Sequence, residues 1–571
     1  MFCHLTTPEG DQVSDRPWQV YPRPQLRRDS WLNLNGLWEF AVQDTDQPPT
    51  RYDRTIRVPF CPESQLSGIH THFPEGSFLF YRRRFSLPEH FVRDRVLLHI
   101  GAADQVLDCW INGRPAGSHT GGYDAITFDI TDALRPHNEL VLRVRDDLRS
   151  CMLPYGKQVM ARGGMWYTPV SGIWQTVWLE SLPEHPVLRL DLQADTACAV
   201  IDTGDATQSG TVTVQTPDGP MRCPLVQGRA EVRPQHPRLW SPQDPYLYSF
   251  TLETATDRVE SYFALRELSI RQVDGHARLC LNGQPFFFHG VLDQGYYSDG
   301  LYTPAAPVCY EKDIRAMQAL GFNTLRKHIK VEPEEFYYQC DRLGMVVFQD
   351  MVNNGDYAYW RDTVWPTVGF QTRRSDARMH RDPAARQAFL QGMENTVRQL
   401  KKHPCIALWT IFNEGWGQFD STAAYRRLRQ LDSSRFIDTT SGWFRGGETD
   451  VDSIHHYYGP WRLKAGRRPL LLSEFGGCCL AVEGHLFHPD KAYGYSTCRT
   501  PAELQNAILT LYRRRVLPQI PKGLCGAIYT QLSDVEDEIN GLITFDRRVQ
   551  KLDPAPLQQL AARLQQAIQP R

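Results

Sequence analysis

Residues 407–414 read ALWTIFNE, and residues 470–477 read LLLSEFGG. Each is an apolar run that leads into a glutamate, Glu414 in the first and Glu474 in the second. A continuous apolar run of this length is typical of a strand buried on both faces, as in a parallel barrel. Because the active sites of such barrels lie at the carboxyl ends of the strands, the two glutamates are candidates for paired catalytic roles.

From about residue 271 onward, apolar runs of this kind alternate with helical patterns. Residues 310–320 form an amphipathic segment that ends at Gly321, a C-cap glycine, and residues 555–568 form a last amphipathic segment. Eight strands are predicted, the number that closes a (β/α)8 barrel over residues 271–571. They lie near residues 286–293, 324–329, 345–351, 406–414, 436–442, 452–459, 470–476 and 525–531.

Two β-domains are predicted ahead of the barrel. Residues 1–182 hold short alternating apolar segments, such as 96–100, and an Asn112-Gly113 step that is a strong hairpin signal. This pattern fits a two-sheet β-sandwich or jelly roll. Residues 183–270 continue the strand pattern over the length of one immunoglobulin-like sandwich, without needing its disulfide.

The size and charge of the chain restrict its class. With 571 residues it is too long for one core, and about three domains are expected. Its 63 Lys and Arg nearly balance its 65 Asp and Glu, so net charge favours neither a nucleic-acid nor a membrane partner. The first residues show no signal-peptide pattern, and no later run is long enough to span a membrane. We therefore expect a cytoplasmic protein that acts on a small molecule.

Cysteine and histidine usage argues against disulfides and metal sites. The 14 cysteines include no C-x-x-C pair, and the vicinal Cys478 and Cys479 cannot form an ordinary disulfide without strain. Reduced thiols are the expectation. A structural zinc site needs clustered Cys or His ligands at short spacings, and His455-His456 with other scattered histidines does not supply such a cluster. We expect no catalytic transition metal and no cofactor.

On the predicted strand count, Glu414 ends the fourth strand and Glu474 the seventh, so the two face each other across the barrel mouth. Hydrolysis of a β-glycoside with retention needs two carboxyl groups roughly 5–5.5 Å apart. Asn413, beside Glu414, offers an amide to a neighbouring sugar hydroxyl. The alternative is that either glutamate is a barrel-end carboxylate paired with Arg or Lys. An unpaired charge at the end of a buried strand is costly unless a function retains it, which favours the catalytic interpretation.

A series of motifs runs through the whole chain in a fixed order. They are LNGLWEF (34–40), WING (110–113), GGY (121–123), FDIT (128–131), SGIWQ (171–175), LWSP (239–242), PYLY (245–248), NG (282–283), GFN (321–323), Arg326 with His328, FNE (412–414) and SEFGG (473–477). In this order they resemble glycoside hydrolase family 2, the family of β-galactosidases, β-glucuronidases and β-mannosidases. The resemblance covers nearly the whole chain.

The resemblance implies a retaining, exo-acting β-glycosidase that removes one sugar from a small glycoside or oligosaccharide. It also implies that the jelly roll at residues 1–182 is a sugar-binding-like domain. It assigns the acid/base role to Glu414, which must begin protonated, and the nucleophile to Glu474. Tyr457 matches the family tyrosine that hydrogen-bonds the nucleophile, and His328 matches a histidine that contacts sugar hydroxyls. Because members of the family are often oligomeric, a homo-oligomer is left open.

Further side chains at predicted strand ends are candidates for binding the sugar. They are Asp293 and Gln294 after the first strand, Arg326 on the second, Trp443 after the fifth and Gln531 at the end of the eighth. For Asp293 and Gln294, capping of the loop is an equal alternative. For Trp443, ordinary packing in the core is an equal alternative. The acidic run at 534–538 is expected to be a solvated loop, with hydroxyl or hard-cation binding as the alternative.

Three departures from the family pattern leave the sugar open. Galactosidases and glucuronidases of the family carry an Asp in the first domain, where residues 161–166 here read ARGGMW. Many relatives carry a Trp on the eighth strand, where residues 529–531 read YTQ. The Asn-x-Lys motif of glucuronidases is reduced to Asn540. The last departure disfavours a uronide, unless Arg162 or Arg326 binds its carboxylate.

The sequence leaves several alternatives to a β-galactosidase-like glycosidase with altered sugar-recognition residues. A non-catalytic carbohydrate-binding protein could have kept the fold, because one fold can host many functions. Retention of Asn413, Glu414, Tyr457 and Glu474 argues against that reading, since a decayed enzyme would most readily lose one of them. Within the enzyme class, a β-uronidase acting on a glucuronide or galacturonide is the alternative. Transglycosylation shares the covalent intermediate, and the linkage and the aglycone stay open.

Overall fold

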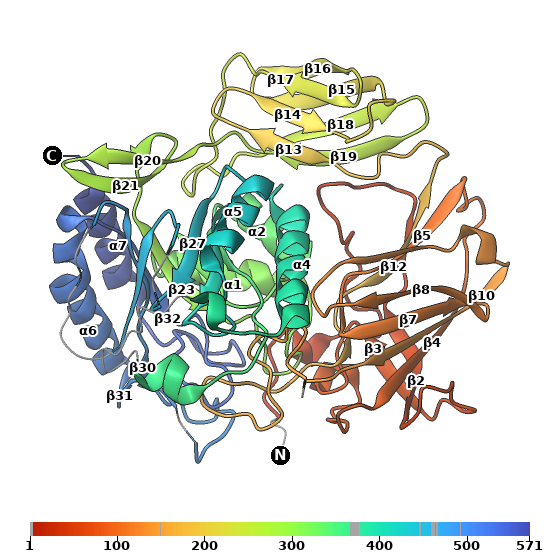
Figure 1. Ribbon diagram of the computed structural model, residues 1–571, viewed down its shortest axis with the longest axis horizontal. Coiled ribbons are helices and arrows are strands. Elements are labelled where there is room, and N and C mark those ends of the chain that lie inside the picture. Colours follow the sequence, from red (N-terminus) through yellow and green to blue (C-terminus); the bar gives the residue numbers. More distant parts are fainter. Residues whose placement is uncertain are drawn as a thin grey trace.

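The computed structural model describes residues 4–148, 150–365, 376–444, 447–457, 463, 466–491 and 493–570. Figure 1 shows three parts: a β-sandwich at the start of the chain in red to orange, a second β-sandwich in yellow, and a barrel in green to blue. This order confirms the predicted fold class. The domain boundaries at residues 182 and 270 stay a prediction.

Two antiparallel sheets make up the first sandwich, in the orders β1-β12-β5-β9 and β3-β2-β4-β10-β7-β8. The strands, with the short β6 and β11 beside them, are β1 (Trp31–Asn33), β2 (Gly36–Gln43), β3 (Arg54–Val58), β4 (Phe78–Ser86), β5 (Arg95–Ile100), β6 (Ala103–Asp104), β7 (Val106–Ile111), β8 (Arg114–Thr120), β9 (Ile126–Asp129), β10 (His137–Arg145), β11 (Gly172–Ile173) and β12 (Val177–Leu182). Apolar side chains of both sheets, among them Trp38 and Phe40, form one buried cluster. Asn112 (φ 53°) and Gly113 (φ 78°) connect β7 to β8, which confirms the predicted hairpin turn.

The second sandwich packs a sheet in the order β13-β14-β17 against one in the order β16-β15-β18-β19. Its strands are β13 (Asp191–Ala194), β14 (Ala199–Asp202), β15 (Gly210–Thr216), β16 (Gly219–Leu225), β17 (Arg229–Val232), β18 (Tyr248–Thr254) and β19 (Arg258–Phe263). A small sheet of β20 (Leu268–Val273), β21 (His276–Leu281) and β22 (Gln284–Pro285) then leads into the barrel. All cysteines among the described residues are free.

The barrel contains all eight predicted strands. They are β23 (Phe288–Asp293), β24 (Thr324–Lys327), β25 (Val346–Asp350), β26 (Ile406–Asn413), β27 (Phe436–Ser441), β28 (Asp452–His456), β29 (Leu470–Gly476) and β32 (Leu524–Thr530). The hydrogen-bonded order is β27-β26-β25-β24-β23-β32-β29-β28, and every pair is parallel. Side chains join the two ends of this order, because Ser453 on β28 donates to Asp438 on β27 at 2.8 Å. Residues 458 and 459 of the predicted sixth strand lie outside the described residues.

Helices lie around this sheet. They are α1 (Val308–Ala319), α2 (Glu334–Leu343), α4 (Pro383–Leu400), α5 (Ser421–Leu431), α6 (Pro501–Leu511), which continues as η6 (Tyr512–Val516) and η7 (Leu517–Lys522), and α7 (Pro554–Ile568). The predicted helices correspond to α1, which ends before Gly321 (φ 84°), and to the closing helix α7. None of the described residues between β27 and β29 is helical.

A segment of the first domain reaches the barrel. The backbone N–H groups of Tyr155 and Gly156 donate to the carbonyl of Asn353, which follows β25, at 3.0 and 3.3 Å. Gly156 has a φ of 65°, and a Cβ there would lie 3.1 Å from the carbonyl oxygen of Ile329, which follows β24. The close approach of the backbone therefore brings the next residue, Lys157, to the barrel mouth.

Within the described residues, no helix combines the length and the apolar character needed to cross a membrane.

Candidate active site

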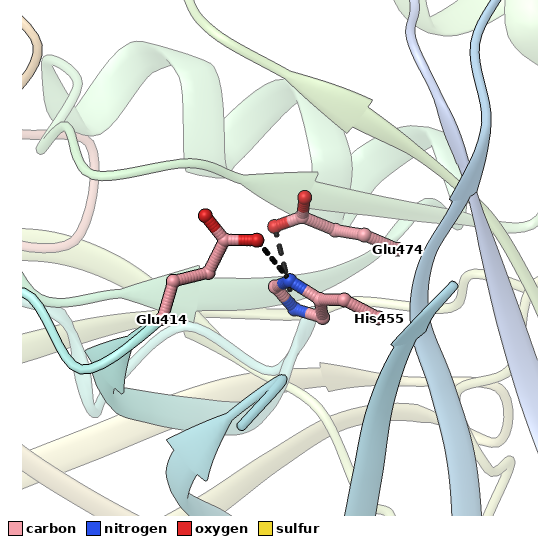
Figure 2. A group of neighbouring side chains, drawn as sticks. All are labelled: Glu414, His455 and Glu474. Atoms are coloured by element: carbon pink, nitrogen blue, oxygen red, sulfur yellow. Dashed lines mark hydrogen bonds and ion pairs between the residues drawn. The ribbon is translucent and has the colours of Figure 1, made fainter. Parts of the chain in front are cut away.

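Glu474 lies on β29 and Glu414 directly follows β26, so both are at the carboxyl ends of barrel strands. Figure 2 shows their carboxylates turned toward each other and toward the ring of His455 on β28. One oxygen of each carboxylate and one ring nitrogen of His455 all lie within 4.8 Å of one another. The structure thus brings together the two glutamates that the sequence singled out, and adds a histidine.

The backbone after β26 turns sharply to present Glu414. Glu414 has a φ of 55° and Gly415 a φ of 75°, so two successive residues are in the left-handed region. A Cβ at Gly415 would lie 2.3 Å from a ring carbon of Phe444, so only glycine fits there. The turn directs the Glu414 side chain across the mouth instead of along the strand.

Glu474 is held as a carboxylate. Its Oε1 accepts from Nη1 of Arg326 at 2.9 Å, and its Oε2 accepts from the hydroxyl of Tyr457 at 2.7 Å. Burial would raise the pKa of Glu474, but the neighbouring His455 and Arg326 outweigh it and lower that pKa to about 2. The group is therefore ionised at neutral pH.

Arg326 is the centre of the buried polar network. Its Nε donates to both oxygens of Asp350 at 3.0 and 3.1 Å, and its Nη2 donates to the side-chain oxygen of Asn413 at 2.9 Å. Its side chain is 1% exposed. One guanidinium thus orients the Asn413 amide and the Glu474 carboxylate together, because its donors diverge in a rigid plane.

We expect Arg326→Gln to lower the free energy of unfolding of the barrel by about 3–5 kcal/mol, because the carboxylates of Asp350 and Glu474 would lose their buried cation. The measurement is the urea midpoint of the barrel transition, followed by tryptophan fluorescence. The matched control is Arg84→Gln, since the Arg84 side chain is 63% exposed and its surface ion pairs contribute little. Equal midpoints for the two variants would contradict this account of Arg326.

Tyr457 contacts both Glu474 and the eighth strand. Besides its bond to Glu474, its hydroxyl is 2.9 Å from Oγ1 of Thr530. Its ring stacks on Tyr495 with centroids 3.8 Å apart and planes within 9°. Burial, together with the charge of Glu474, raises the pKa of Tyr457 well above its usual range. The hydroxyl therefore stays protonated and can donate to the carboxylate.

His328 also joins this network, through Asp350. Its Nδ1 lies 2.6 Å from Oδ2 of Asp350, the aspartate that binds Arg326. Burial, together with the positive charge of Lys157, lowers the pKa of His328 to about 4. The imidazole is therefore neutral at pH 7, a state that suits a hydrogen bond to a sugar hydroxyl.

Gln294 and Gln531 belong to a chain of polar side chains along the eighth strand. Gln294 donates to Gln531, Gln531 to Asn540, and Asn540 to Glu538, each at 2.9 Å. Glu538 also accepts from the hydroxyl of Tyr167 at 2.5 Å. The chain therefore runs from the barrel mouth into the first domain.

Two of the predicted sugar-binding residues, Trp443 and Asp293, have partners within the protein. Trp443 donates from Nε1 to the carbonyl of Asp362, and its ring meets the His455 ring edge-on at 5.5 Å. Asp293 pairs with Lys327 at 2.6 Å. Because Arg326 points into the barrel, the next residue points outward, so Asp293 lies on the outer face and away from the two glutamates.

The acidic run at 534–538 is buried, and the prediction of a solvated loop is wrong. Its four acidic side chains are between 2% and 4% exposed. Asp534 pairs with Lys551 at 2.7 Å, and Glu536 accepts from the backbone N–H of Thr168 at 2.9 Å. The run is covered because the first domain docks on it, a contact that no local sequence pattern records.

Sequence reasoning missed three residues of the site: Asp350, His455 and Lys157. Asp350 is the last residue of β25, where strand ends were expected to carry function. His455 lies two residues before Tyr457 and therefore on the same side of the strand, which is a signal that could have found it. Lys157 comes from another domain, and no spacing along the chain points to it.

Glu414, His455 and Glu474 could each offer one ligand atom to a metal ion. The Nδ1 of His455 and Oε1 of Glu414 are only 2.7 Å apart, however. Two ligands of one tetrahedral zinc ion lie about 3.3 Å apart. The contact therefore has the length of a direct hydrogen bond, and the three residues do not fit a shared ion as they stand.

Comparisons with known proteins agree with this geometry. The family profile described as glycosyl hydrolases family 2, TIM barrel domain, matches residues 272–549, and that described as glycosyl hydrolases family 2 matches residues 189–266. A curated relative is the β-glucuronidase of Chlorocebus aethiops, 25% identical over 80% of this chain and 80% of its own.

Two solved structures share the fold. A β-glucuronidase of an uncultured Clostridium species matches 96% of this chain and 100% of its own, at a TM-score of 0.72 and 17% identity. A β-galacturonidase of Eisenbergiella tayi bound to galacturonate matches 97% of this chain and 99% of its own, at a TM-score of 0.66 and 17% identity. These likenesses extend over nearly the whole chain.

Proposed function

The chain belongs to glycosyl hydrolase family 2, and on that basis we propose that it is a retaining, exo-acting β-glycosidase that forms a covalent glycosyl-enzyme intermediate. The observation that carries the proposal is the carboxylate pair. Oxygens of Glu414 and Glu474 lie within 4.8 Å of each other across the barrel mouth. Retaining enzymes hold their carboxyl groups about 5–5.5 Å apart, whereas inverting enzymes need about 6.5–9.5 Å to admit a water.

The surroundings of each glutamate support different roles for the two. Glu474 is ionised and fixed by Arg326 and Tyr457, as a nucleophile requires. In the proposed first step its oxygen bonds to the anomeric carbon, the bond to the leaving oxygen breaks, and Glu414 gives that oxygen a proton. In the second step Glu414 removes a proton from water, and the water oxygen replaces Glu474 on the anomeric carbon.

The experiment that tests the proposal is hydrolysis of a panel of aryl β-glycosides, covering galactoside, glucoside, mannoside, fucoside, arabinopyranoside, glucuronide and galacturonide. The configuration of the first product formed is followed by proton NMR. We expect one sugar to be released as its β-anomer, in agreement with retention. An α-anomer released first would overturn the retaining course. Inactivity on every member, combined with measurable binding of a sugar, would support the alternative of a carbohydrate-binding protein.

We propose the cytoplasm as the location, supported by the free thiols of the described cysteines, among them the adjacent Cys478 and Cys479. The proposed substrate is a small glycoside or oligosaccharide. A homo-oligomer stays a prediction.

A uronide is the second candidate for the substrate, favoured by Lys157. The two arginines considered from the sequence are already engaged: Arg326 with Asp350 and Glu474, and Arg162 with the acidic run at 534–538. Lys157 is half-buried, and its ammonium lies 6.0 Å from the centre of the Tyr167 ring. No carboxylate of the described residues forms an ion pair with it, so a substrate carboxylate would be its natural partner.

The position of Lys157 supports this assignment. Its neighbours Tyr155 and Gly156 bind the backbone of Asn353 after β25. Its positive charge contributes to lowering the pKa of His328 and of Glu474, which line the mouth. A half-buried cation beside the nucleophile would attract an anionic sugar and fix its orientation.

We expect Lys157→Met to lower kcat/KM for a uronide about 10- to 100-fold, since a hydrogen bond to a charged group contributes about 1.5–3 kcal/mol. The matched neutral pyranoside should change much less. Lys522→Met is the control, because Lys522 is an exposed lysine at the end of η7. The same loss on the neutral and the anionic sugar would contradict a role in binding the carboxylate.

A further inference from the structure

The His455 ring lies between the two glutamates, with its side chain fully buried. Its Nδ1 is 2.7 Å from Oε1 of Glu414, and its Nε2 is 3.5 Å from Oε1 of Glu474 (Figure 2). His455 also pairs in register with Glu474 across β28 and β29. It is therefore in direct contact with the proposed acid/base and close to the proposed nucleophile.

The hydrogen-bond partners of Nε2 show which ring nitrogen carries a hydrogen. Nε2 is 3.1 Å from the hydroxyl of Ser441, which donates its own hydrogen to Oγ of Ser473 at 3.0 Å. Ser473 in turn lies within 3.4 Å of the carbonyl of Ile454, to which it donates. Since a hydroxyl has one hydrogen, Ser441 accepts from Nε2, and Nε2 bears a hydrogen.

Arg326 does not reverse this assignment. Its Nη1 is 3.4 Å from Nε2, but the two hydrogens on Nη1 point to the carbonyl of Ser473 at 3.0 Å and to Oε1 of Glu474 at 2.9 Å. No hydrogen of Nη1 is left to donate to the ring. The hydrogen of Nε2 is therefore held in place by the two serines.

The contact between Nδ1 and Glu414 then needs a proton of its own. Two acceptors 2.7 Å apart with no hydrogen between them would repel each other. The pair is either a protonated Glu414 facing a neutral ring or an ionised Glu414 facing an imidazolium. Both forms carry the same number of protons, so one proton lies in the bond that joins the two side chains.

We propose that this proton, shared by Glu414 and His455, is the one that the enzyme delivers to the leaving oxygen. The inference rests on the proposed function and deepens it. In the first step an oxygen of Glu474 bonds to the anomeric carbon, and the bond from that carbon to the leaving oxygen breaks. The shared proton passes through Glu414 to the leaving oxygen. Nδ1 and the Glu414 carboxylate then face each other without a proton, which makes Glu414 a stronger base for the water of the second step. The proton taken from that water restores the shared bond.

His455 is thus a positioning residue that acts through Glu414. The charged groups that face its ring are Glu414 after β26, Glu474 on β29, Arg326 on β24 and Asp438 on β27. Substitution of His455 would remove one of the two side chains that hold the shared proton.

The test is the pH dependence of kcat/KM for a β-glycoside with a poor leaving group. An asparagine at 455 can still hydrogen-bond Glu414 but cannot carry a proton. We expect His455→Asn to move the basic limb of the profile down by one pH unit or more, and to lower kcat/KM at neutral pH about 10- to 100-fold. A substrate with a strongly activated leaving group should be much less affected. His455→Gln serves as the second variant where the first does not fold.

His236→Asn is the matched control, because it makes the same substitution at a histidine of the second sandwich whose side chain is 73% exposed. Its basic limb should stay in place. A slower enzyme with an unmoved limb in His455→Asn would mean that His455 only supports the structure, and an equal shift in the control would equally overturn the proposal. Failure of the proposed function is distinguishable, since the wild-type protein would then hydrolyse no member of the glycoside panel.

Discussion

Replacing Glu474 by glutamine is expected to lower kcat at least about 10⁴-fold on every glycoside, because removing the nucleophile removes the covalent pathway itself. The amide is nearly the same size as the carboxylate, so Arg326 and Tyr457 keep a partner at this position. The fold should therefore persist. The measurement is steady-state hydrolysis of the best substrate of the panel, with circular dichroism of the same samples.

The control for this variant is Glu253→Gln, an exposed glutamate on β18 of the second sandwich, which should be fully active. A stronger check uses a 2-deoxy-2-fluoro aryl glycoside, which slows the second step and lets the covalent intermediate accumulate. Mass spectrometry of the digested enzyme should then find the sugar on the peptide that contains Glu474. A label on any other residue would refute its assignment as nucleophile.

The effect of Glu414→Gln should depend on the leaving group. With a poor leaving group, kcat/KM should fall about 10²- to 10⁴-fold, the usual contribution of general acid catalysis. With a dinitrophenyl leaving group, which departs without a proton, kcat/KM should fall less than about 10-fold. The measurement is kcat/KM for a series of aryl glycosides plotted against the acidity of the leaving phenol, and the slope should steepen in the variant.

A second readout separates Glu414 from a residue that only supports the site. Azide needs no general base, so it should restore turnover of the activated substrate by Glu414→Gln and yield the β-glycosyl azide. The wild-type protein gives no such product in quantity. Equal losses on good and poor leaving groups, without rescue by azide, would contradict the acid/base assignment of Glu414.

The barrel was predictable because its strands are buried on both faces. In β26 and β29 every residue before the glutamates except Asn413 is apolar or small, a pattern typical of strands buried on both faces. Because such strands show no alternation of apolar and polar residues, the sequence does not indicate which side chains point into the barrel. Asp293 was therefore expected in the pocket, although it lies one position out of phase and pairs with Lys327 on the outer face.

Other parts of the site depend on contacts between segments distant in sequence. The acidic run at 534–538 was expected in solvent and is buried, because Tyr167, Thr168 and Arg162 of the first domain cover it. The local amino-acid composition of residues 534–538 reports only that the segment is charged. It gives no information on the hydrogen-bond donors of these carboxylates, which lie some 370 residues away in the chain.

The order of the three folds, the eight barrel strands and the places of Glu414 and Glu474 at strand ends were predictable from the amino-acid sequence. These follow from hydrophobic periodicity, which is a local property of the chain. Three features became visible in the folded protein alone: His455 lies between the two carboxylates, Arg326 joins Asn413 to Glu474, and Lys157 of another domain reaches the mouth. Such arrangements depend on barrel closure and on domain docking, which bring side chains from separate strands and domains within hydrogen-bonding distance of one another.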